Sequence, residues 1–398
     1  MAKILVLDGH SSAALAFTRS AGRAGHWVAV GANAGQFAAA KLSRYCKSAF
    51  DYPVSTVDAS LFVDSVLDYV SRNAIDLVVP VSDWTLQPLS EQRERFKDVC
   101  RLVLPPHESV LKTSDKFRTI EIARSVGVSV PQTWLITEQC DLDQLAGLTF
   151  PVVVKDRASV RWSGNSAIFG SVAYTFGKEE LEQVVCNRLQ IAGDVLVQEF
   201  TTGIGIGVSL FVTKNGTGLP FMWERIREVD PRGSASSCRR SIPLDRGLVD
   251  LSSRLIQAIG FEGIAMVEYK KSAQGRAVLM EINGRPWGSI ALPIESGIDY
   301  PRFLIDYCLT ETMPPREIPY SPRITCRRVV GELTHLSNLR RGAPPHWPAK
   351  YPGFWSSVFE IAIPWYPGMR YDDVWLSDPR PGIAQIRNWF RARNKRRT

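Results

Sequence analysis

Two carboxylates and an amide near residue 275 are the side chains of this chain best suited to bind a metal ion. Apolar and polar residues alternate along Ala277–Asn283, so Glu281 and Asn283 should leave that strand on one face. The polar turn Lys271–Arg276 predicts a hairpin with the preceding strand, which places Glu268 on the same face if the loop holds an even number of residues. These oxygen ligands suit a hard divalent cation such as Mg²⁺. The alternative is a solvent-exposed polar face beside a Lys or Arg. The apolar side chains that we expect to be buried are those of Val278, Met280 and Ile282.

Two lysines could neutralise the charge of a phosphate. Lys155 ends the apolar run Pro151–Val154 and precedes a small polar loop, Ser163–Ser166, whose backbone N–H groups could add to its charge. Lys116 lies in the first turn of a helix that Ser114 is expected to cap, where a cation is disfavoured unless an anion is bound. The alternative for either lysine is a solvated surface position.

Five arginines suggest an anionic substrate close to the metal. They are Arg225, Arg227, Arg239, Arg240 and Arg285. Arg285 follows Asn283 by two residues, close enough to contact the same phosphate or carboxylate, and this combination is typical of phosphoryl transfer. Clustered arginines can instead form surface ion pairs, for which Glu224 and Glu228 are available near the first two. Arg239 and Arg240 have no acid within four residues, so ion pairing is the weaker explanation there.

Length and composition limit the class of protein. The 398 residues predict two or three domains, and 45% hydrophobic with 22% charged residues is ordinary for a globular protein. The sequence has no apolar run of about 18 residues, and Ile4–Leu7 is too short for a secretion signal, so we expect a cytoplasmic protein. Seven scattered cysteines and five histidines match no zinc or redox motif.

The net charge of +8 is concentrated at the C-terminus. Six basic residues of the last dozen leave a charge of only +2 on the rest of the chain: Arg387, Arg391, Arg393, Lys395, Arg396 and Arg397. A nearly neutral body does not predict a nucleic-acid-binding domain. We expect the basic tail to be a solvated, disordered end, and contact with anionic lipid or RNA is the alternative.

The elements that would position these residues fall into three stretches. Alternating strand and helix patterns in the first hundred residues predict a parallel sheet with helices on both faces. The expected strands are 3–7, 27–31 and 76–81, and the expected helices are 11–24 and 59–71. The first turn, Leu7–Ala13, lacks the glycines of a dinucleotide-binding motif. After Pro105–Pro106 a helix, a mixed strand region and the hairpin follow. Beyond residue 313 prolines and tryptophans dominate, and we expect Trp347, Trp355, Trp365 and Trp375 to fill a core or an interface.

Taken in chain order, these motifs and predicted elements resemble the ATP-grasp superfamily, in the branch of carbamoyl-phosphate-synthase-like carboxylate–amine ligases. The resemblance covers residues 1 to about 310. It rests on Ser114-Asp-Lys116 at a helix start, Val152-Val-Val-Lys155 before a loop, Val197-Gln-Glu-Phe200, and Glu268 with Met280-Glu-Ile-Asn-Gly-Arg285. The last motif is the most specific. Two positions depart from the family pattern: the loop after Lys155 is poor in glycine, and Gly205 stands where an acidic residue often holds ribose.

The resemblance implies a fold of mixed α/β and α+β class in three parts. These are an N-terminal parallel-sheet, Rossmann-like pre-ATP-grasp domain at 1–105, a two-lobed ATP-grasp domain at 106–312 with a lid subdomain at about 131–200, and a small C-terminal α+β appendage with a basic tail at 313–398. It also implies ATP and Mg²⁺ as cofactors. The ATP-binding residues would be Lys116, Lys155, Gly164, Gln198, Glu199 and Phe200, the magnesium ligands Glu268, Glu281 and Asn283, and the catalytic residues Arg285 and Lys155. We expect the other four arginines, Arg225, Arg227, Arg239 and Arg240, to bind the substrate.

The predicted function is that of a ligase that activates a carboxylate as an acyl phosphate and joins it to an amine, with an amino acid or small peptide-like molecule as substrate. The alternatives are an ATP-grasp kinase or phosphotransferase, a non-catalytic nucleotide-binding protein, and a peripheral membrane protein. Small molecules are the expected partners, without nucleic acid. The two substrates, the ribose-binding residue and the oligomeric state are not legible from the sequence.

Overall fold

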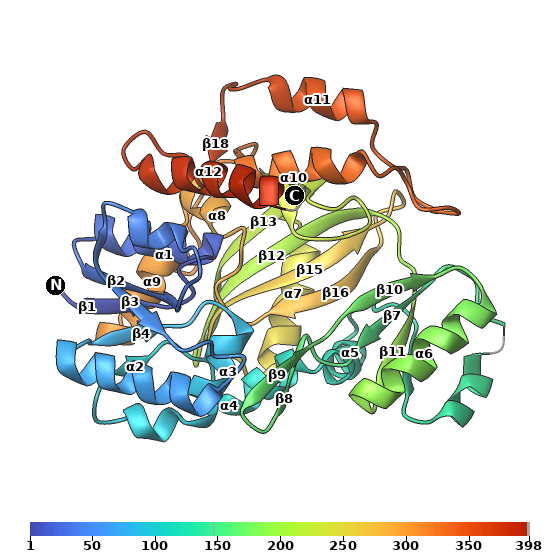
Figure 1. Cartoon of the computed structure of the whole chain (residues 1–398), viewed down its shortest axis with the longest axis horizontal. Helices are drawn as coiled ribbons and strands as arrows, with labels where there is room; N and C mark the ends of the chain where they lie inside the picture. The colour runs from blue at the N-terminus through green and yellow to red at the C-terminus, as the bar shows by residue number, and fades with distance from the viewer. Residues whose placement is uncertain (146, 396–398) are drawn as a thin grey trace.

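The computed structural model describes residues 1–145 and 147–395. Its N-terminal part is a five-stranded parallel sheet of order β3-β2-β1-β4-β5 (Figure 1). The strands are β1 (Lys3–Val6), β2 (Trp27–Asn33), β3 (Cys46–Tyr52), β4 (Leu77–Val79) and β5 (Arg101–Leu102), and the main helices are α1 (Ser12–Arg23), α2 (Ala59–Asn73) and α3 (Asp83–Glu91). Along β1, Ile4 and Val6 pack on the α1 side whereas Leu5 packs on the α2 side. The predicted parallel sheet with two covered faces is therefore confirmed.

A second sheet, of order β10-β7-β11-β6, is antiparallel and lies at the opposite end of the molecule from the N-terminus (Figure 1). Its strands are β6 (Thr133–Ile136), β7 (Val152–Asp156), β10 (Val172–Thr175) and β11 (Val195–Glu199), covered by α6 (Lys178–Ala192). We call this unit the lid sheet. A separate hairpin, β8 (Val160–Ser163) and β9 (Ser166–Phe169), leaves β7 and reaches the N-terminal part.

Two short helices connect the N-terminal sheet to the lid sheet. They are α4 (His107–Ser114) and α5 (Lys116–Ser125). The expected cap at Ser114 is wrong, because Ser114 ends α4, and the side chain of Asp115 accepts a hydrogen bond from the Arg118 N–H at 3.0 Å instead. Lys116 is therefore the first residue of α5, which agrees with its predicted place in the first turn of a helix. A cation is disfavoured at this end of a helix unless an anion is bound there.

The central sheet has seven strands in the order β16-β15-β12-β13-β14-β17-β18. The strands are β12 (Ile204–Thr213), β13 (Gly216–Glu228), β14 (Ser236–Ile242), β15 (Gly263–Lys271), β16 (Ala277–Asn283), β17 (Thr325–Arg327) and β18 (Met369–Tyr371). One face packs against the amphipathic helix α7 (Arg246–Ile259), and the other joins the apolar core around α1, α8 (Ala291–Ser296) and α9 (Tyr300–Thr310). The last two strands come from the C-terminal region, so that region extends the same sheet.

Three further helices form a layer on the upper side of the molecule in Figure 1. They are α10 (Val329–Leu339), α11 (Phe354–Ala362) and α12 (Arg380–Lys395). The predicted disorder of the basic end is therefore wrong as far as Lys395, because its residues continue a helix. Trp347 and Trp375 pack as expected, Trp347 against Phe200 and Trp375 under the Arg19 guanidinium. The expectation fails for Trp355 and Trp365, whose exposed fractions are 69% and 63%. No helix in the described part of the chain has the length and apolar character needed to cross a bilayer.

Candidate active site

The hairpin of β15 and β16 brings its acidic residues together by means of a β-bulge. The five-residue turn pairs Tyr269 with Leu279, and a regular register would then place Met280 opposite Glu268. Instead the register shifts at this point and Glu268 pairs with Glu281. The extra residue is Met280, which is half-buried and lines the cleft. The predicted shared face is therefore present, whereas the predicted burial of Met280 in the core is wrong.

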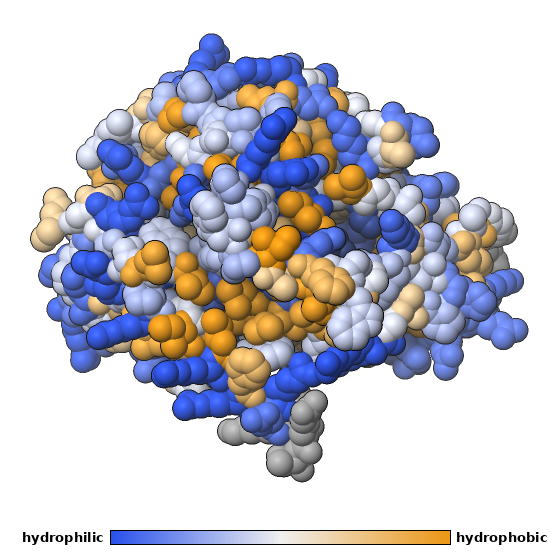
Figure 2. Space-filling model, turned by 90° about the horizontal axis from the view of Figure 1, so that it is seen from above, coloured by the Kyte–Doolittle hydropathy of each residue, from blue (hydrophilic) through white to orange (hydrophobic). Residues whose placement is uncertain are grey.

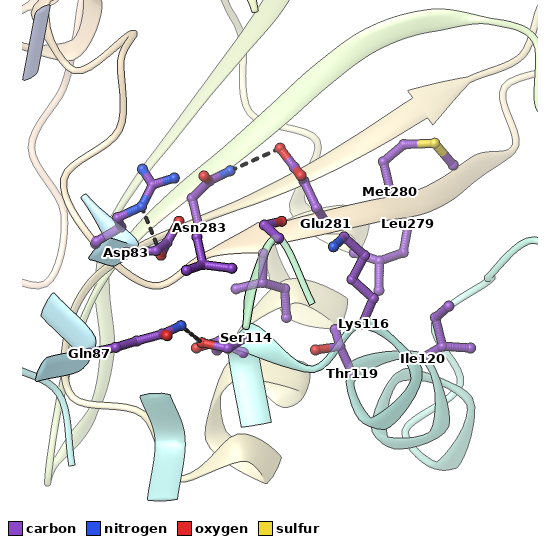
Figure 3. Close-up of a pocket in the computed structure, with 15 residues that line it drawn as sticks. Asp83, Gln87, Ser114, Lys116, Thr119, Ile120, Leu279, Met280, Glu281 and Asn283 are labelled. Atoms are coloured by element: carbon purple, nitrogen blue, oxygen red, sulfur yellow. Dashed lines mark hydrogen bonds and ion pairs between the residues drawn. The ribbon is translucent and has the colours of Figure 1, made fainter. Parts of the chain in front are cut away.

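Asn283 lies between the two carboxylates. Its amide nitrogen is 3.4 Å from Glu268 Oε1 and 3.4 Å from Glu281 Oε1, and Figure 3 shows the contact with Glu281. Arg225 of β13, which is separated from β15 by β12, donates to Glu268 Oε2 at 2.7 Å. Burial raises the pKa of Glu268 to about 7, although the Arg225 charge acts in the opposite direction. A positive charge added beside Glu268 would favour its ionised form.

The two lysines reach the same cleft from different elements. Lys116 rises from the start of α5 and points toward Glu281 (Figure 3), and Lys155 comes from β7 of the lid sheet. Lys155 Nζ donates to Gln198 Oε1 at 2.6 Å. Burial, and next the Lys116 charge, lower the pKa of Lys155 to about 8, and burial also lowers the pKa of Lys116. Two neighbouring ammonium groups with lowered pKa values indicate a site that favours a bound anion.

Arg285 links the hairpin to the N-terminal part. Its Nε lies 3.0 Å from Asp83 Oδ1, at the start of α3. Burial, the largest single influence, opposes the charge of Arg285, but the carboxylates of Asp83, Glu281 and Asp8 together outweigh it and the pKa of Arg285 is raised. The arginine therefore remains charged at the floor of the cleft.

These groups line one continuous cleft of about 450 Å³. It runs from the end of β11, at Gln198, Glu199 and Phe200, past the lysines to the carboxylates, and ends near Trp287 and Arg328. A smaller cavity of about 60 Å³ adjoins it and shares Lys116, Glu281, Asn283 and Arg285 with it (Figure 3). Ten of the predicted site residues thus line the same cleft, namely Lys116, Lys155, Gln198, Glu199, Phe200, Arg225, Glu268, Glu281, Asn283 and Arg285.

Three predicted substrate arginines lie elsewhere, because acids distant in sequence pair with them. Arg227 is buried against Glu332 of α10, at 2.9 Å, and also contacts Glu360. Arg239 is buried in an ion pair with Asp372. Arg240 pairs with Glu224 at the surface. The predicted substrate role of Arg227, Arg239 and Arg240 is therefore not supported by their geometry.

Gly164 also lies outside the cleft. It occupies the tip of the β8–β9 hairpin with φ +58°, a conformation that favours glycine. Around it the hairpin bonds to the segment before α2: Ala167 N donates to the Thr56 carbonyl at 2.8 Å, and Ala59 N donates to the Asn165 carbonyl at 2.9 Å. The predicted contact of this glycine with phosphate is not present in this arrangement.

Arg328 is a cleft residue that the sequence reasoning missed. It directly follows β17 and lines the end of the cleft, where its Nη1 lies 3.4 Å from Ser12 Oγ. No acidic side chain of the described residues forms an ion pair with it, and burial lowers its pKa. Its neighbour Arg327 points away to the carbonyls of α11. A half-buried cation that faces a cleft and forms no direct ion pair among the described residues is suited to bind an anionic group.

The residues present suit a divalent ion that a bound nucleotide also ligates better than a metal ion held by protein side chains alone. No group of three or more His, Cys, Asp or Glu side chains among the described residues is placed to hold a metal. Glu268, Glu281 and a rotated Asn283 amide would supply three oxygens, and Mg²⁺ is commonly completed by water and substrate phosphates. Lys116 and Lys155 lie where such phosphates would need neutralising charge.

Comparisons with known proteins agree with this geometry. Residues 194–329 match a family model described as "ATP-grasp in the biosynthetic pathway with Ter operon". Among solved structures, N5-carboxyaminoimidazole synthetase from Staphylococcus aureus superposes with a TM-score of 0.65 at 16% identity, covering 87% of this chain and 86% of that one. The L-amino acid ligase from Bacillus licheniformis gives 0.60 at 16% identity, covering 78% and 74%. The chain has the ATP-grasp fold.

The curated proteins that are similar to this chain include ligases and a resistance protein. The vancomycin/teicoplanin A-type resistance protein VanA of Enterococcus faecium is 26% identical over 187 residues, which are 43% of this chain and 52% of VanA. The D-alanine–D-alanine ligase of Pseudomonas entomophila is 28% identical over 185 residues, which are 43% of this chain and 54% of the ligase. The chain thus spans about half the length of the curated relatives it matches.

Proposed function

We propose that this protein is an ATP- and Mg²⁺-dependent ligase that joins a carboxylate to an amine through an acyl phosphate. One observation carries the proposal: Glu268, Glu281 and Asn283 share a cleft with Lys116, Lys155 and Arg285. The names of the D-alanine–D-alanine ligase and the L-amino acid ligase among similar proteins support a C–N bond-forming reaction and favour an amino acid or small peptide-like substrate.

The chemistry of each group follows from its position. A carboxylate is a poor electrophile, and transfer of the γ-phosphoryl group makes it an acyl phosphate that an amine can attack with release of phosphate. Glu268, Glu281 and Asn283 would hold Mg²⁺, which supplies positive charge beside the phosphates when bound. Lys116 and Lys155 neutralise phosphate charge, and Arg285 offsets the charge that develops during transfer. The lid sheet covers the cleft and protects the acyl phosphate from water.

The adenine and the substrate are proposed to bind at opposite ends of the cleft. The backbone of Gln198 to Phe200 faces the adenine, since these residues line the end nearest the lid sheet. Arg328, which contacts Ser12 of α1, lies toward the other end and favours a carboxylate-bearing substrate there, and Arg225 lies between the two ends beside Glu268. The Gln198 side chain also orients the Lys155 ammonium. It accepts a hydrogen bond from Lys155 Nζ and donates one to Thr133 Oγ1 at 2.8 Å.

We also propose the domain division 1–105, 106–312 and 313–398, with the lid subdomain at about 131–200. The parallel sheet, the lid sheet and the central sheet support it. The C-terminal region is the least separate of the three, since β17 and β18 continue the central sheet.

A matrix of carboxylates against amines tests the function. ADP formation would be measured together with mass spectrometry of the products. The expected result is ADP and phosphate release that requires both substrates, with an amide as product. Glu281→Ala should lower this activity by about a hundredfold or more, since a metal ligand is lost. ADP release that is unchanged in Glu281→Ala, or a phosphorylated end product formed without an amine, would contradict the proposal.

Arg328 provides a second test of the same function. Arg328→Met should raise the KM for the carboxylate substrate by about tenfold or more and leave the KM for ATP nearly unchanged, because the arginine lies at the end of the cleft away from Gln198. Arg323→Met, on the exposed turn before β17, is the matched control. Equal effects of Arg328→Met on both KM values would contradict this placement of the substrate.

A further inference from the structure

Helix α11 is apolar on both of its faces. Phe354, Ser357, Val358 and Ile361 are buried or half-buried and form the inner face at helical spacing. Trp355, Phe359 and Ala362 are exposed and form the outer face at the same spacing. The exposed fractions of Trp355 and Phe359 are 69% and 72%. A surface helix normally turns polar residues outward, so the outer face of α11 is built for contact with something beyond the chain.

Polar contacts from the central sheet hold this helix in place. Arg327 donates to the carbonyls of Glu360, at 2.9 Å, and of Ile363, at 2.7 Å, and thereby satisfies the C-terminal end of the helix. Arg227 pairs with the Glu360 side chain. Both arginines are themselves buried. The outer tryptophan and phenylalanine are therefore presented by an anchored helix, and the exposed Trp365 follows directly after it.

Basic residues accompany the apolar face. The sequence from 340 to 395 contains nine Arg or Lys and four acids. Asp372, Asp373 and Asp378 are buried, and Glu360 is paired with Arg227. Helix α12 presents an exposed stripe of Ile383, Arg387, Phe390 and Arg391 at helical spacing, and neither arginine forms an ion pair with a described acid. The layer thus combines bulky apolar side chains with uncompensated positive charge.

The surface view shows how this side of the molecule is arranged. Figure 2 looks down on the side that carries α11 and α12 and shows apolar side chains gathered over its middle, with hydrophilic ones around them. Figure 1 shows α11 as the outermost element on this side, standing away from the central sheet. A projecting helix suits a broad, flat surface better than a narrow peptide, which needs a groove.

We propose that α11 and α12 dock this chain on an anionic lipid surface. Trp355, Phe359 and Trp365 enter the headgroup region, where aromatic side chains are favoured, and Arg387 and Arg391 contact lipid phosphates. Self-association through the same face is disfavoured, because it would bring the basic residues of two copies together. The inference rests on the C-terminal layer alone and is independent of the reaction in the cleft.

Vesicle sedimentation of the full chain tests the proposal. Vesicles of phosphatidylcholine alone would be compared with vesicles that contain phosphatidylserine, at low and high salt. We expect binding only to the anionic vesicles and weaker binding at high salt. The double variants Trp355→Ser/Phe359→Ser and Arg387→Ala/Arg391→Ala should each weaken binding by about tenfold or more. The matched controls are Ile191→Ser on α6 and Arg254→Ala on α7, both exposed, which should bind as the unchanged protein does.

Several outcomes would overturn the docking surface. These are no binding to anionic vesicles, equal binding to neutral ones, and full binding by Trp355→Ser/Phe359→Ser, which would assign the affinity to the basic tail alone. Sedimentation velocity without lipid is the second measurement. A dimer that Trp355→Ser/Phe359→Ser converts to a monomer would assign the face to a second copy of this chain and likewise overturn the proposal. Circular dichroism of each variant establishes that it is folded.

Discussion

Lys155 shows how a single side chain can couple nucleotide binding to pH. It is a buried cation whose ammonium is oriented by Gln198 and repelled by Lys116. Its lowered pKa means that the group loses its proton near pH 8 when no anion is bound. A phosphate beside it would favour the charged form, so phosphate binding and protonation of Lys155 should support each other.

We therefore expect the affinity for Mg·ATP to fall by about tenfold between pH 7 and pH 9, because the free protein must take up a proton at Lys155 to bind. Calorimetric titration across this range would measure the effect. In Lys155→Arg the charge persists at every pH used, so the fall should be much smaller. An affinity that is constant from pH 7 to pH 9 in the unchanged protein would rule out this role.

Gly207 leaves space for a cleft residue. A Cβ at this position would lie 2.3 Å from Trp223 Nε1, and Trp223 lines the cleft. Gly207→Ala should displace the indole and destabilise the fold by about 1–3 kcal/mol, with loss of activity, as measured by thermal unfolding and ADP release. In Gly247→Ala the new methyl group would meet nothing closer than 3.6 Å, so little change is expected. Equal stability of the two variants would contradict the steric argument.

The local sequence around each arginine could not show which arginines face the cleft. Arg227 and Arg239 are held away from the cleft by ion pairs with Glu332 and Asp372, which lie about a hundred residues or more away in sequence. Arg327 and Arg328 are adjacent, yet one holds α11 and the other lines the cleft. The local sequence contains the residue types, whereas the strand order that selects among them is a long-range property.

At the scale of elements, the β15–β16 hairpin was predictable and its bulge was not. Alternation along Ala277–Asn283 and the polar turn indicated both the strands and the face that carries Glu281 and Asn283. The turn has five residues, an odd number, and the extra residue Met280 restores the pairing of Glu268 with Glu281. A one-residue irregularity leaves little trace in hydrophobic periodicity, which explains why Met280 was expected in the core.

The start of α10 depends on a buried acid. Asp373 Oδ1 accepts from Val329 N at 3.4 Å, while its other oxygen has no hydrogen-bond partner among the described residues. Burial, and next the Asp372 charge, raise its pKa to about 6. Since the folded-state pKa is above the unfolded one, this group stabilises the fold fully below about pH 4, and that contribution is lost as the pH rises through about 6.

Asp373→Asn keeps the acceptor oxygen and removes the charge. We expect it to raise the free energy of unfolding at pH 8 by up to about 3 kcal/mol, and at pH 5 by about half as much. Thermal unfolding at the two pH values would measure the difference. The exposed Asp250→Asn on α7 is the control. A gain that is equal at pH 5 and pH 8 would exclude titration of Asp373 as the cause.

At the scale of the whole molecule, Arg19 joins the two ends of the chain. It lies on α1, is fully buried, and donates to Asp378 Oδ2 at 2.9 Å and to the Asp372 carbonyl at 2.7 Å, with Trp375 stacked 4.4 Å from its guanidinium. Arg19→Met should lower the free energy of unfolding by about 3–5 kcal/mol, because it leaves the buried Asp378 unpaired. Arg23→Met, on the exposed end of α1, should cost about 1 kcal/mol or less. Chemical denaturation compares the two, and similar losses would contradict the assigned importance of Arg19.

The sequence predicted the parallel N-terminal sheet, the helix that carries Lys116 and the metal-binding hairpin, because each depends on local periodicity. It did not indicate β3, whose alternating exposed residues Cys46–Tyr52 include charged side chains. Nor did it indicate that β17 and β18 extend the central sheet, since that pairing joins segments far apart in the chain. Trp355 and Trp365 were expected inside because tryptophan is usually buried, and composition cannot show which face of a helix is covered.

The β8–β9 hairpin connects the lid-sheet side of the cleft to the N-terminal part. Two backbone hydrogen bonds, and those of Ser166 Oγ to the Val57 carbonyl and Ser60 Oγ to Asn165 Oδ1, fasten it to the segment around the start of α2. Trp162 Nε1 of the same hairpin also donates to Gln87 Oε1 of α3 at 2.7 Å. An outward movement of the lid sheet would therefore have to break these five bonds or move the N-terminal sheet with it. The rates at which a nucleotide enters and leaves would then depend on hydrogen bonds that lie about 35 Å of extended chain away from Lys155.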